Sequence, residues 1–173
     1  VSREWLELFR LREELTRRVD AGAIQPVFLD HHVCHAASSF LVSPFERSAI
    51  LVVDGASEAD TTLMASGEGS RITVLDRTPL PHSLGQFYAA MTAFLGFRPD
   101  QDEYIVMGLA SSGEPTFAPA LRQNIVRLLS RGRFEVNVRL LDFPLARAGF
   151  FVEGFVRLFG STRGSPAEIT QRH

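Results

Sequence analysis

The sequence predicts an α/β fold in which a mixed sheet is flanked by helices, because the spacing of apolar residues changes along the chain. Residues 48–53 form a near-continuous apolar run, the pattern of a buried strand, and residues 61–66 and 71–75 have the composition of two further strands. Residues 2–19 instead repeat their apolar side chains at helical spacing. With 173 residues, the chain has the length of one domain.

Composition excludes several classes of protein. The formal charge of −2 and the pI near 6.2 give no basic surface for nucleic acid. The single cysteine rules out an internal disulfide and indicates a reducing compartment, so we expect a cytoplasmic protein. No apolar run has the length of a membrane span, and the N-terminal residues lack the pattern of a signal peptide. Because the chain begins at Val1 without methionine, we expect an excised or trimmed piece of a longer protein.

The first half of the chain alternates helix and strand. The helix at 2–19 should end at Gly22 and lead into a short strand at 26–29. A second helix is expected at 33–41, before the buried strand at 48–53. The strands at 61–66 and 71–75 should form an antiparallel hairpin through the glycine-rich turn at 67–69.

The second half is predicted to be mainly helical. Ser83 should begin a helix that runs to Gly96, with Leu84, Phe87, Tyr88, Met91 and Leu95 on one side. A loop at 102–113 follows it. Further along we expect an amphipathic helix, an alternating strand, a phenylalanine-rich core helix and a polar tail, at residues 117–129, 133–141, 150–159 and 162–173.

Two histidines have the spacing of a metal site. If residues 33–41 are helical, His31 and His35 lie one turn apart on one face, so their rings can converge on one cation. Two ligands are too few, and a third must come from elsewhere. His32 is expected to point away from the pair, and Cys34 also falls off the shared face. The alternative is that the histidines cap the helix and bond to carbonyl groups.

Other candidates for a site lie in turns and on the next helix. Asp54 and Gly55 follow the buried strand, where a carboxylate beside free N–H groups can hold a hydrated cation and phosphate oxygens. A hairpin tip is the alternative for this dipeptide. The Tyr88 hydroxyl could reach a substrate or bond to the backbone, and we expect a structural role for His82. Gly108 lies in a stretch where the backbone could approach a ligand.

Four motifs together resemble the O-carbamoyltransferases of antibiotic and nodulation-factor biosynthesis. Their order and spacing match as well as their residues, and the resemblance is firm over residues 26–115. The motifs are D-H-H-x-x-H-A-A-S-S-F at 30–40, D-G-A-S-E at 54–58, P-H-S-L-G-Q-F-Y at 81–88 and E-Y-I-V-M-G-L-A-S-S-G-E-P at 103–115. Members of the family usually have lysine where this chain has Ile105, and Pro-Tyr where it has Ser111-Ser112.

The resemblance also implies a fold. It is that of the actin, sugar-kinase and Hsp70 class, shared with the tRNA threonylcarbamoylation enzyme that has the same HxxxH motif. Residues 1–173 would then be a single partial domain, a fragment of the carbamoyl-transfer domain. By the same resemblance, the adenylate-forming domain would lie outside this chain, and a long helix would begin just past His173. Exposed edges of such a partial sheet could pair, so a homodimer is possible.

The function that the resemblance implies is carbamoyl transfer. Such enzymes use carbamoyl phosphate and ATP to form a carbamoyl-adenylate, and pass the carbamoyl group to a hydroxyl of a sugar or other small natural product. His31 and His35 would ligate a divalent metal, commonly iron, with a distant aspartate outside this chain. Asp54, Gly55 and Glu58 would line the phosphate-binding turn, where magnesium could also bind, and the general base would also lie outside the chain. Tyr88 and Gly108 complete the expected substrate and nucleotide site.

Three other interpretations stay open. Asp30-His31-His32 is also the signature of DHH phosphoesterases, although residues 1–25 lack the aspartate-rich motifs that those enzymes need. A threonylcarbamoyl-transfer protein that acts on tRNA is the second, and the near-neutral charge counts against it. The third is a catalytically inactive binding or assembly module, which Ile105 and the missing segments would favour.

Overall fold

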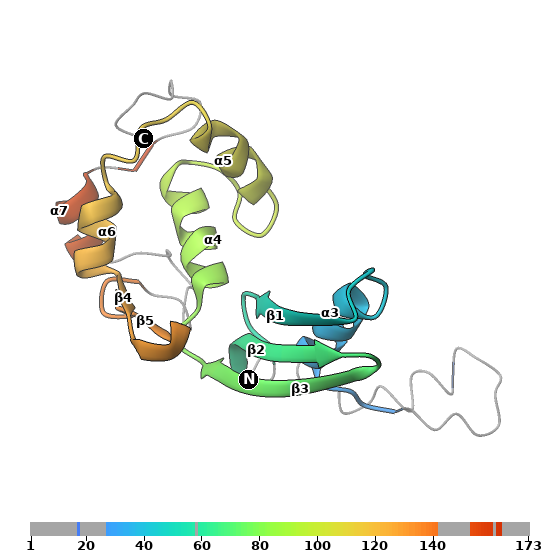
Figure 1. The fold of residues 1–173 in the computed structure, drawn as a ribbon. Helices are drawn as coiled ribbons and strands as arrows, with labels where there is room; N and C mark the ends of the chain where they lie inside the picture. The colour runs from blue at the N-terminus through green and yellow to red at the C-terminus, as the bar shows by residue number, and fades with distance from the viewer. Residues whose placement is uncertain (1–16, 18–26, 58, 142–152, 161, 164–173) are drawn as a thin grey trace. The chain divides into compact units, whose positions relative to one another are not determined.

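The computed structural model describes residues 17, 27–57, 59–141, 153–160 and 162–163 (Figure 1). The chain divides into two units, Val1–Asp30 and His31–His173. In the first unit, residues 27–30 have no regular secondary structure, so the strand predicted at 26–29 is not found in its described part. The helix predicted at 2–19 lies outside the described residues, apart from Arg17, which is helical.

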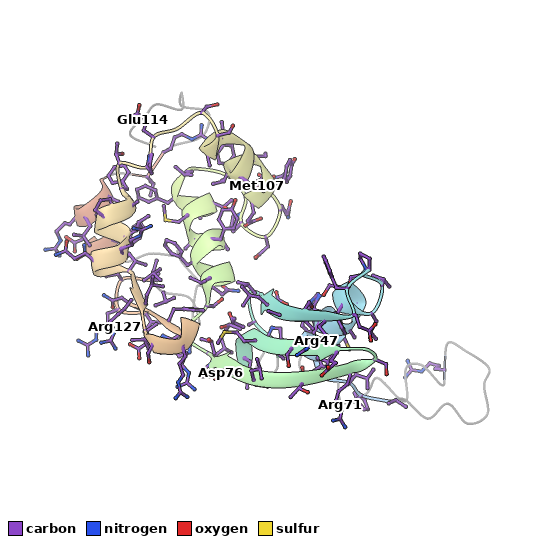
Figure 2. All side chains as sticks on the ribbon, in the orientation of Figure 1. Arg47, Arg71, Asp76, Met107, Glu114 and Arg127 are labelled. Carbon is purple, nitrogen blue, oxygen red and sulfur yellow. The ribbon has the colours of Figure 1, made fainter. Side chains whose placement is uncertain are left out.

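The second unit begins with a helix and a three-stranded antiparallel sheet. Strands β1 (Arg47–Val53), β2 (Asp60–Glu68) and β3 (Arg71–Pro79) lie in the order β1-β2-β3 (Figure 1). The β2–β3 hairpin turns at Gly69, whose φ of 58° is a conformation that glycine adopts without strain. At the same end of the sheet, Arg47 of β1, which Figure 2 labels, forms an ion pair with Glu68 of β2. The predicted hairpin is therefore confirmed, with longer strands.

Helix α3 (His31–Phe40) covers one face of this sheet because its apolar stripe meets alternate residues of the strands. The helix includes both His31 and His35, so the two histidines of the HxxxH motif are separated by one helical turn, as predicted. The buried cluster between helix and sheet consists of Ala36, Phe40, Ile50, Val52, Leu63 and Ala65.

The opposite face of β1 is open among the described residues. Burial alternates along the strand, and Leu51 and Val53 are 66% and 47% exposed. Among the described residues, the strand predicted at 48–53 is therefore buried on one face and not, as a continuous apolar run indicates, on both. The cause is that α3 packs on only one face of the described sheet. Side chains alternate along a strand, so Leu51 and Val53 point away from the helix.

A second core forms around helix α4 (Leu84–Phe94), which Ser83 caps as predicted. Gln86 N–H donates to the Ser83 hydroxyl at 2.9 Å. Two rings of α7 (Glu153–Phe159) lie in this core, and Phe155 packs edge-to-face on Phe94 with ring centroids 5.3 Å apart. The prediction of a core helix is confirmed over its described residues. The buried members of the cluster are Ala90, Phe94, Ile125, Phe134, Val136, Leu141, Phe155 and Phe159.

Three predictions in this half need correction, for the loop at 102–113, the helix at 117–129 and the strand at 133–141. The loop predicted at 102–113 is largely the helix α5 (Glu103–Ala110). The helix predicted at 117–129 is the shorter α6 (Ala118–Asn124), because residues beyond it form the strand β4 (Val126–Leu128). This strand pairs antiparallel with β5 (Phe134–Val136), and the turn between them contains the single-turn 3₁₀ helix η1 (Ser130–Gly132).

The strand predicted at 133–141 is thus reduced to three residues, and the pairing of β4 with β5 decides its length. After β5 the chain turns at Asn137, whose amide donates to the Asn124 carbonyl at 3.0 Å. In the described ranges, no helix has both the length and the apolar character of a membrane span.

Candidate metal centre

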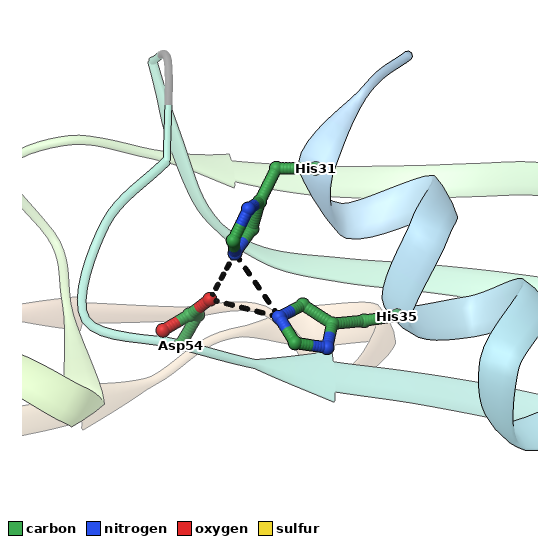
Figure 3. Close-up of side chains that lie close together, drawn as sticks. All are labelled: His31, His35 and Asp54. Carbon is green, nitrogen blue, oxygen red and sulfur yellow. Dashed lines mark hydrogen bonds and ion pairs between the residues drawn. The ribbon is translucent and has the colours of Figure 1, made fainter. Parts of the chain in front are cut away.

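Helix α3 places His31 and His35 one turn apart, and both rings project to the same side (Figure 3). Their Nε2 atoms are 3.0 Å apart, and the rings meet edge to face. About half of each side chain is exposed, so the pair is open to solvent. The prediction that these two histidines share a face is confirmed.

The carboxylate of Asp54 completes a cluster with the two imidazoles (Figure 3). Asp54 is the first residue after β1, and its N–H donates to the Thr61 carbonyl at 2.9 Å, which fixes the turn. Its Oδ2 atom lies 2.8 Å from Nε2 of His31 and 3.5 Å from Nε2 of His35. The structure therefore brings a third candidate ligand to the pair from within the chain. The sequence analysis had recognised Asp54 as a possible cation ligand, but the resemblance placed the third ligand of the histidine pair outside the chain.

The geometry of the cluster fits one cation. Ligand atoms that each lie about 2.1 Å from a shared zinc or iron are separated from one another by roughly 3 Å. The three atoms of this cluster are 2.8 to 3.5 Å apart. Two imidazole nitrogens and one carboxylate oxygen also form a donor set that suits divalent iron or zinc and leaves other positions open.

Hydrogen bonds alone satisfy this cluster poorly. Each Nε2 atom carries either a proton or a lone pair. Nε2 of His31 therefore cannot donate to Asp54 and also accept a proton from His35. Three electron-rich atoms that converge at this distance need positive charge between them, as a shared proton or a cation.

The pKa of the Asp54 carboxyl is lowered. Partial burial acts in the opposite direction and would raise this pKa, but hydrogen bonds to the carboxylate outweigh it. Gly55 N–H donates to Oδ1 at 2.6 Å, and the imidazoles of His31 and His35 add attraction for the negative charge. Asp54 therefore offers its ionised form, which is the form that binds metals.

The N-terminus of α4 packs directly against the Asp54 turn. The Ser83 hydroxyl, itself buried, donates to the Gly55 carbonyl at 2.6 Å. A Cβ atom at Gly85 would lie 2.5 Å from the Asp54 carbonyl oxygen, so this contact requires glycine. His82, just before the cap, bonds with the backbone of Val136 through Nδ1 at 3.2 Å, which confirms its predicted structural role.

The burial of His32 was not predicted from the sequence. We expected its ring to point away from the histidine pair, yet it is fully buried and its Nε2 atom is 4.0 Å from Oδ2 of Asp54. The buried stripe of α3 runs through His32, Ala36 and Phe40, so this histidine occupies a core position. Helical spacing correctly predicted that His32 does not share the face of His31 and His35. It did not predict that the loop with Asp54 also lies close to His32.

The remaining predicted site residues are not part of this cluster. The Tyr88 hydroxyl donates to the Glu103 carbonyl at 2.9 Å, which is the backbone alternative considered for it. Gly108 is inside α5, and a Cβ atom there would meet nothing within 4 Å. Gly55 belongs to the Asp54 turn, while Glu58 lies outside the described residues.

The structure thus defines an α/β protein whose two histidines and one carboxylate form a candidate metal centre. Residues 10–170 match the model of a family described as the carbamoyltransferase N-terminus, and the chain belongs to this family.

Several curated proteins are similar in sequence to this chain over part of their own length. An uncharacterised protein of Synechocystis is 38% identical over 147 residues, which is 84% of this chain and 24% of that protein. The nodulation protein NolNO of Sinorhizobium fredii is 36% identical over 80% of this chain and 20% of its own length. The nodulation protein NolO of Bradyrhizobium diazoefficiens is 38% identical over 69% and 22%. The chain therefore spans about a fifth to a quarter of the length of these relatives.

Proposed function

We propose that this chain is part of the transfer domain of an ATP-dependent O-carbamoyltransferase, and that His31, His35 and Asp54 hold a divalent metal, iron in the first instance. The observation that carries this proposal is the convergence of His31 Nε2, His35 Nε2 and Asp54 Oδ2 on one point in a chain of the carbamoyltransferase family. We also propose a cytoplasmic location, because the single cysteine of the chain fits a reducing compartment.

The reaction transfers a carbamoyl group from a carbamoyl-adenylate, made from carbamoyl phosphate and ATP, to a hydroxyl of a small molecule. The hydroxyl oxygen bonds to the carbamoyl carbon, its proton leaves to a base, and AMP departs with the electrons of the broken C–O bond. A cation in the cluster would supply Lewis-acid charge near the phosphate. The described residues contribute the three metal ligands to this site, together with the backbone of Gly55, whose N–H group contacts the Asp54 carboxylate. Tyr88, Gly108 and Glu58 stay candidates for substrate or nucleotide contacts.

We also propose that α3 and β1–β3 belong to a domain of the actin, sugar-kinase and Hsp70 class. The three consecutive antiparallel strands support this assignment, together with the Asp-Gly turn after the first of them, which carries the candidate ligand Asp54. The other segments that such a domain needs would come from the remainder of the parent chain.

Metal content gives the first test. The purified chain is incubated without oxygen with ferrous iron or zinc, and its metal is measured beside a His31→Ala/His35→Ala double variant. We expect about one metal ion per chain in the original protein and its loss in the variant, since two of three ligands are gone. Equal and negligible metal in both would favour the inactive binding module instead.

Activity gives the second test. The product of the complete reading frame that contains this chain is incubated with ATP, labelled carbamoyl phosphate and a panel of sugars and polyketide alcohols. We expect labelled carbamoyl ester from the original protein and at least a 100-fold loss in the double variant. Transfer that is unchanged in a variant without metal would contradict the proposed role of the cluster.

A further inference from the structure

His32 is a polar side chain at a core position. It is fully buried on the stripe of α3 that packs against the sheet. Burial of a polar ring there costs more free energy than burial of an apolar side chain. Its Nε2 atom has no hydrogen-bond partner among the described residues. A buried polar nitrogen without a hydrogen-bond partner is unfavourable and requires an explanation.

Both nitrogens of the His32 ring face the loop that carries Asp54. Nδ1 lies 3.5 Å from the Ser57 hydroxyl oxygen, and Nε2 lies 4.0 Å from Oδ2 of Asp54. A hydroxyl that donates to Nδ1 leaves the ring proton on Nε2, the atom on the side of the carboxylate. In this tautomer, the unpartnered Nε2–H group is on the side of the candidate metal ligand.

We propose that His32 is a positioning residue: the 4.0 Å between its Nε2 atom and Oδ2 of Asp54 is longer than a hydrogen bond, and a small rotation of the carboxylate would let the Nε2–H group hold it beside His31 and His35. Oδ1 of Asp54 already accepts the Gly55 N–H, so a donor at Oδ2 fixes the second oxygen and with it the side-chain rotation. Carboxylates that ligate metals are commonly held by such outer hydrogen bonds. This inference rests on the proposed function.

The test compares two replacements of His32 by cobalt(II) titration, followed through the visible spectrum of the bound ion. His32→Gln keeps an N–H donor near the position of Nε2, whereas His32→Leu keeps the bulk without a donor. We expect a 10- to 100-fold weaker cobalt affinity and an altered spectrum for leucine. Glutamine should stay within a few-fold of the original chain, with its spectrum.

A matched control separates positioning from packing. Thr62 is also buried, and its Oγ1 atom lacks a hydrogen-bond partner among the described residues. Thr62→Val should raise the melting temperature of the metal-free chain and leave cobalt affinity unchanged. His32→Leu should likewise fold without metal, and His32→Met takes its place if the leucine variant is unfolded.

The possible outcomes are distinct. Unchanged affinity and spectrum in His32→Leu, with tight binding by the original chain, overturn the role of His32 and leave the proposed metal site intact. An equal loss in the glutamine and leucine variants also overturns it, since packing alone would then explain the effect. Absence of cobalt binding by the original chain overturns the proposed site and this inference together.

Discussion

Nε2 of His31 lies 2.8 Å from Oδ2 of Asp54, although 23 residues separate them in the sequence. The contact exists because α3 packs on the sheet, so the first turn of the helix comes to lie beside the end of β1. Any change that separates α3 from β1 should therefore also disperse the candidate ligands.

Replacing Asp54 by asparagine should weaken metal binding at least 100-fold. The substitution keeps the size of the side chain and removes the negative charge, which provides most of the attraction of a carboxylate for a divalent cation. Competition with a chromophoric chelator measures the affinity. Asp100→Asn serves as the control, because this carboxylate lies in the loop before α5 and asparagine tolerates its positive φ of 62°. A similar loss in both variants would point to a general effect of charge.

Two glycines in helices should respond in opposite directions to alanine. Gly85→Ala places a methyl group 2.5 Å from the Asp54 carbonyl oxygen, and because this neighbour is backbone, α4 or the turn must shift. Overpacking of this kind costs about 1–3 kcal/mol, which exceeds the gain of up to ~1 kcal/mol in helix propensity. Urea denaturation should show net destabilisation, together with weaker metal binding.

Gly108→Ala is the matched case in open space. A Cβ atom there meets nothing within 4 Å, so alanine should stabilise α5 by about 0.5–1 kcal/mol. Carbamoyl transfer by the complete protein then tests the sequence-based role of Gly108. If the backbone at this position must approach a ligand, activity falls although stability rises. Stabilisation with unchanged activity would remove Gly108 from the candidate site.

Local sequence patterns predicted the elements that depend on neighbouring residues. The β2–β3 hairpin, the cap at Ser83 and the shared face of His31 and His35 all follow from short-range spacing, and the structure confirms them. The end of α6 was mispredicted because the strand pairing of residues 126–128 outweighs a helical pattern of apolar side chains. That pairing depends on residues several positions further along the chain.

The candidate site could be predicted only in part. The Asp54 turn and the HxxxH pair were recognised separately, but their approach depends on the packing of α3 against β1. Burial of His32 was missed for the same reason, since helical spacing gives the direction of a side chain and not what covers it. A histidine followed by Ala36 and Phe40 at four-residue intervals was the available signal for a core position.

Phe155→Ala should destabilise the second core by about 3–5 kcal/mol, the usual cost of removing a buried aromatic ring. The side chain is fully buried and contacts the rings of Phe94 and Phe159. The free energy of unfolding, followed by circular dichroism in urea, gives the measurement. Phe45→Ala is the control, because Phe45 is 64% exposed and its loss should change stability by less than about 0.5 kcal/mol. A small effect at Phe155 would contradict the packing of α7.

The ion pair of Arg98 with Asp102 should make stability depend on pH in the acid range. Hydrogen bonds from the Arg98 side chain, and then from its backbone N–H, hold the pKa of the Asp102 carboxyl below its ordinary value. A carboxyl whose pKa is lower in the folded state stabilises the fold above its unfolded pKa of about 3.9. This contribution disappears as the pH falls through the lower, folded pKa.

The comparison with Asp102→Asn isolates this effect, because the other acidic groups titrate alike in both proteins. The free energies of unfolding of the two should differ by a constant amount above about pH 5, and the difference should shrink steadily toward pH 2. Urea unfolding at a series of pH values gives the measurement. Glu153→Gln is the control, since its pair with Arg157 is largely exposed and should contribute little at any pH. If the difference between the original chain and Asp102→Asn stayed constant down to pH 2, the Arg98 pair would not lower the pKa of Asp102 in solution.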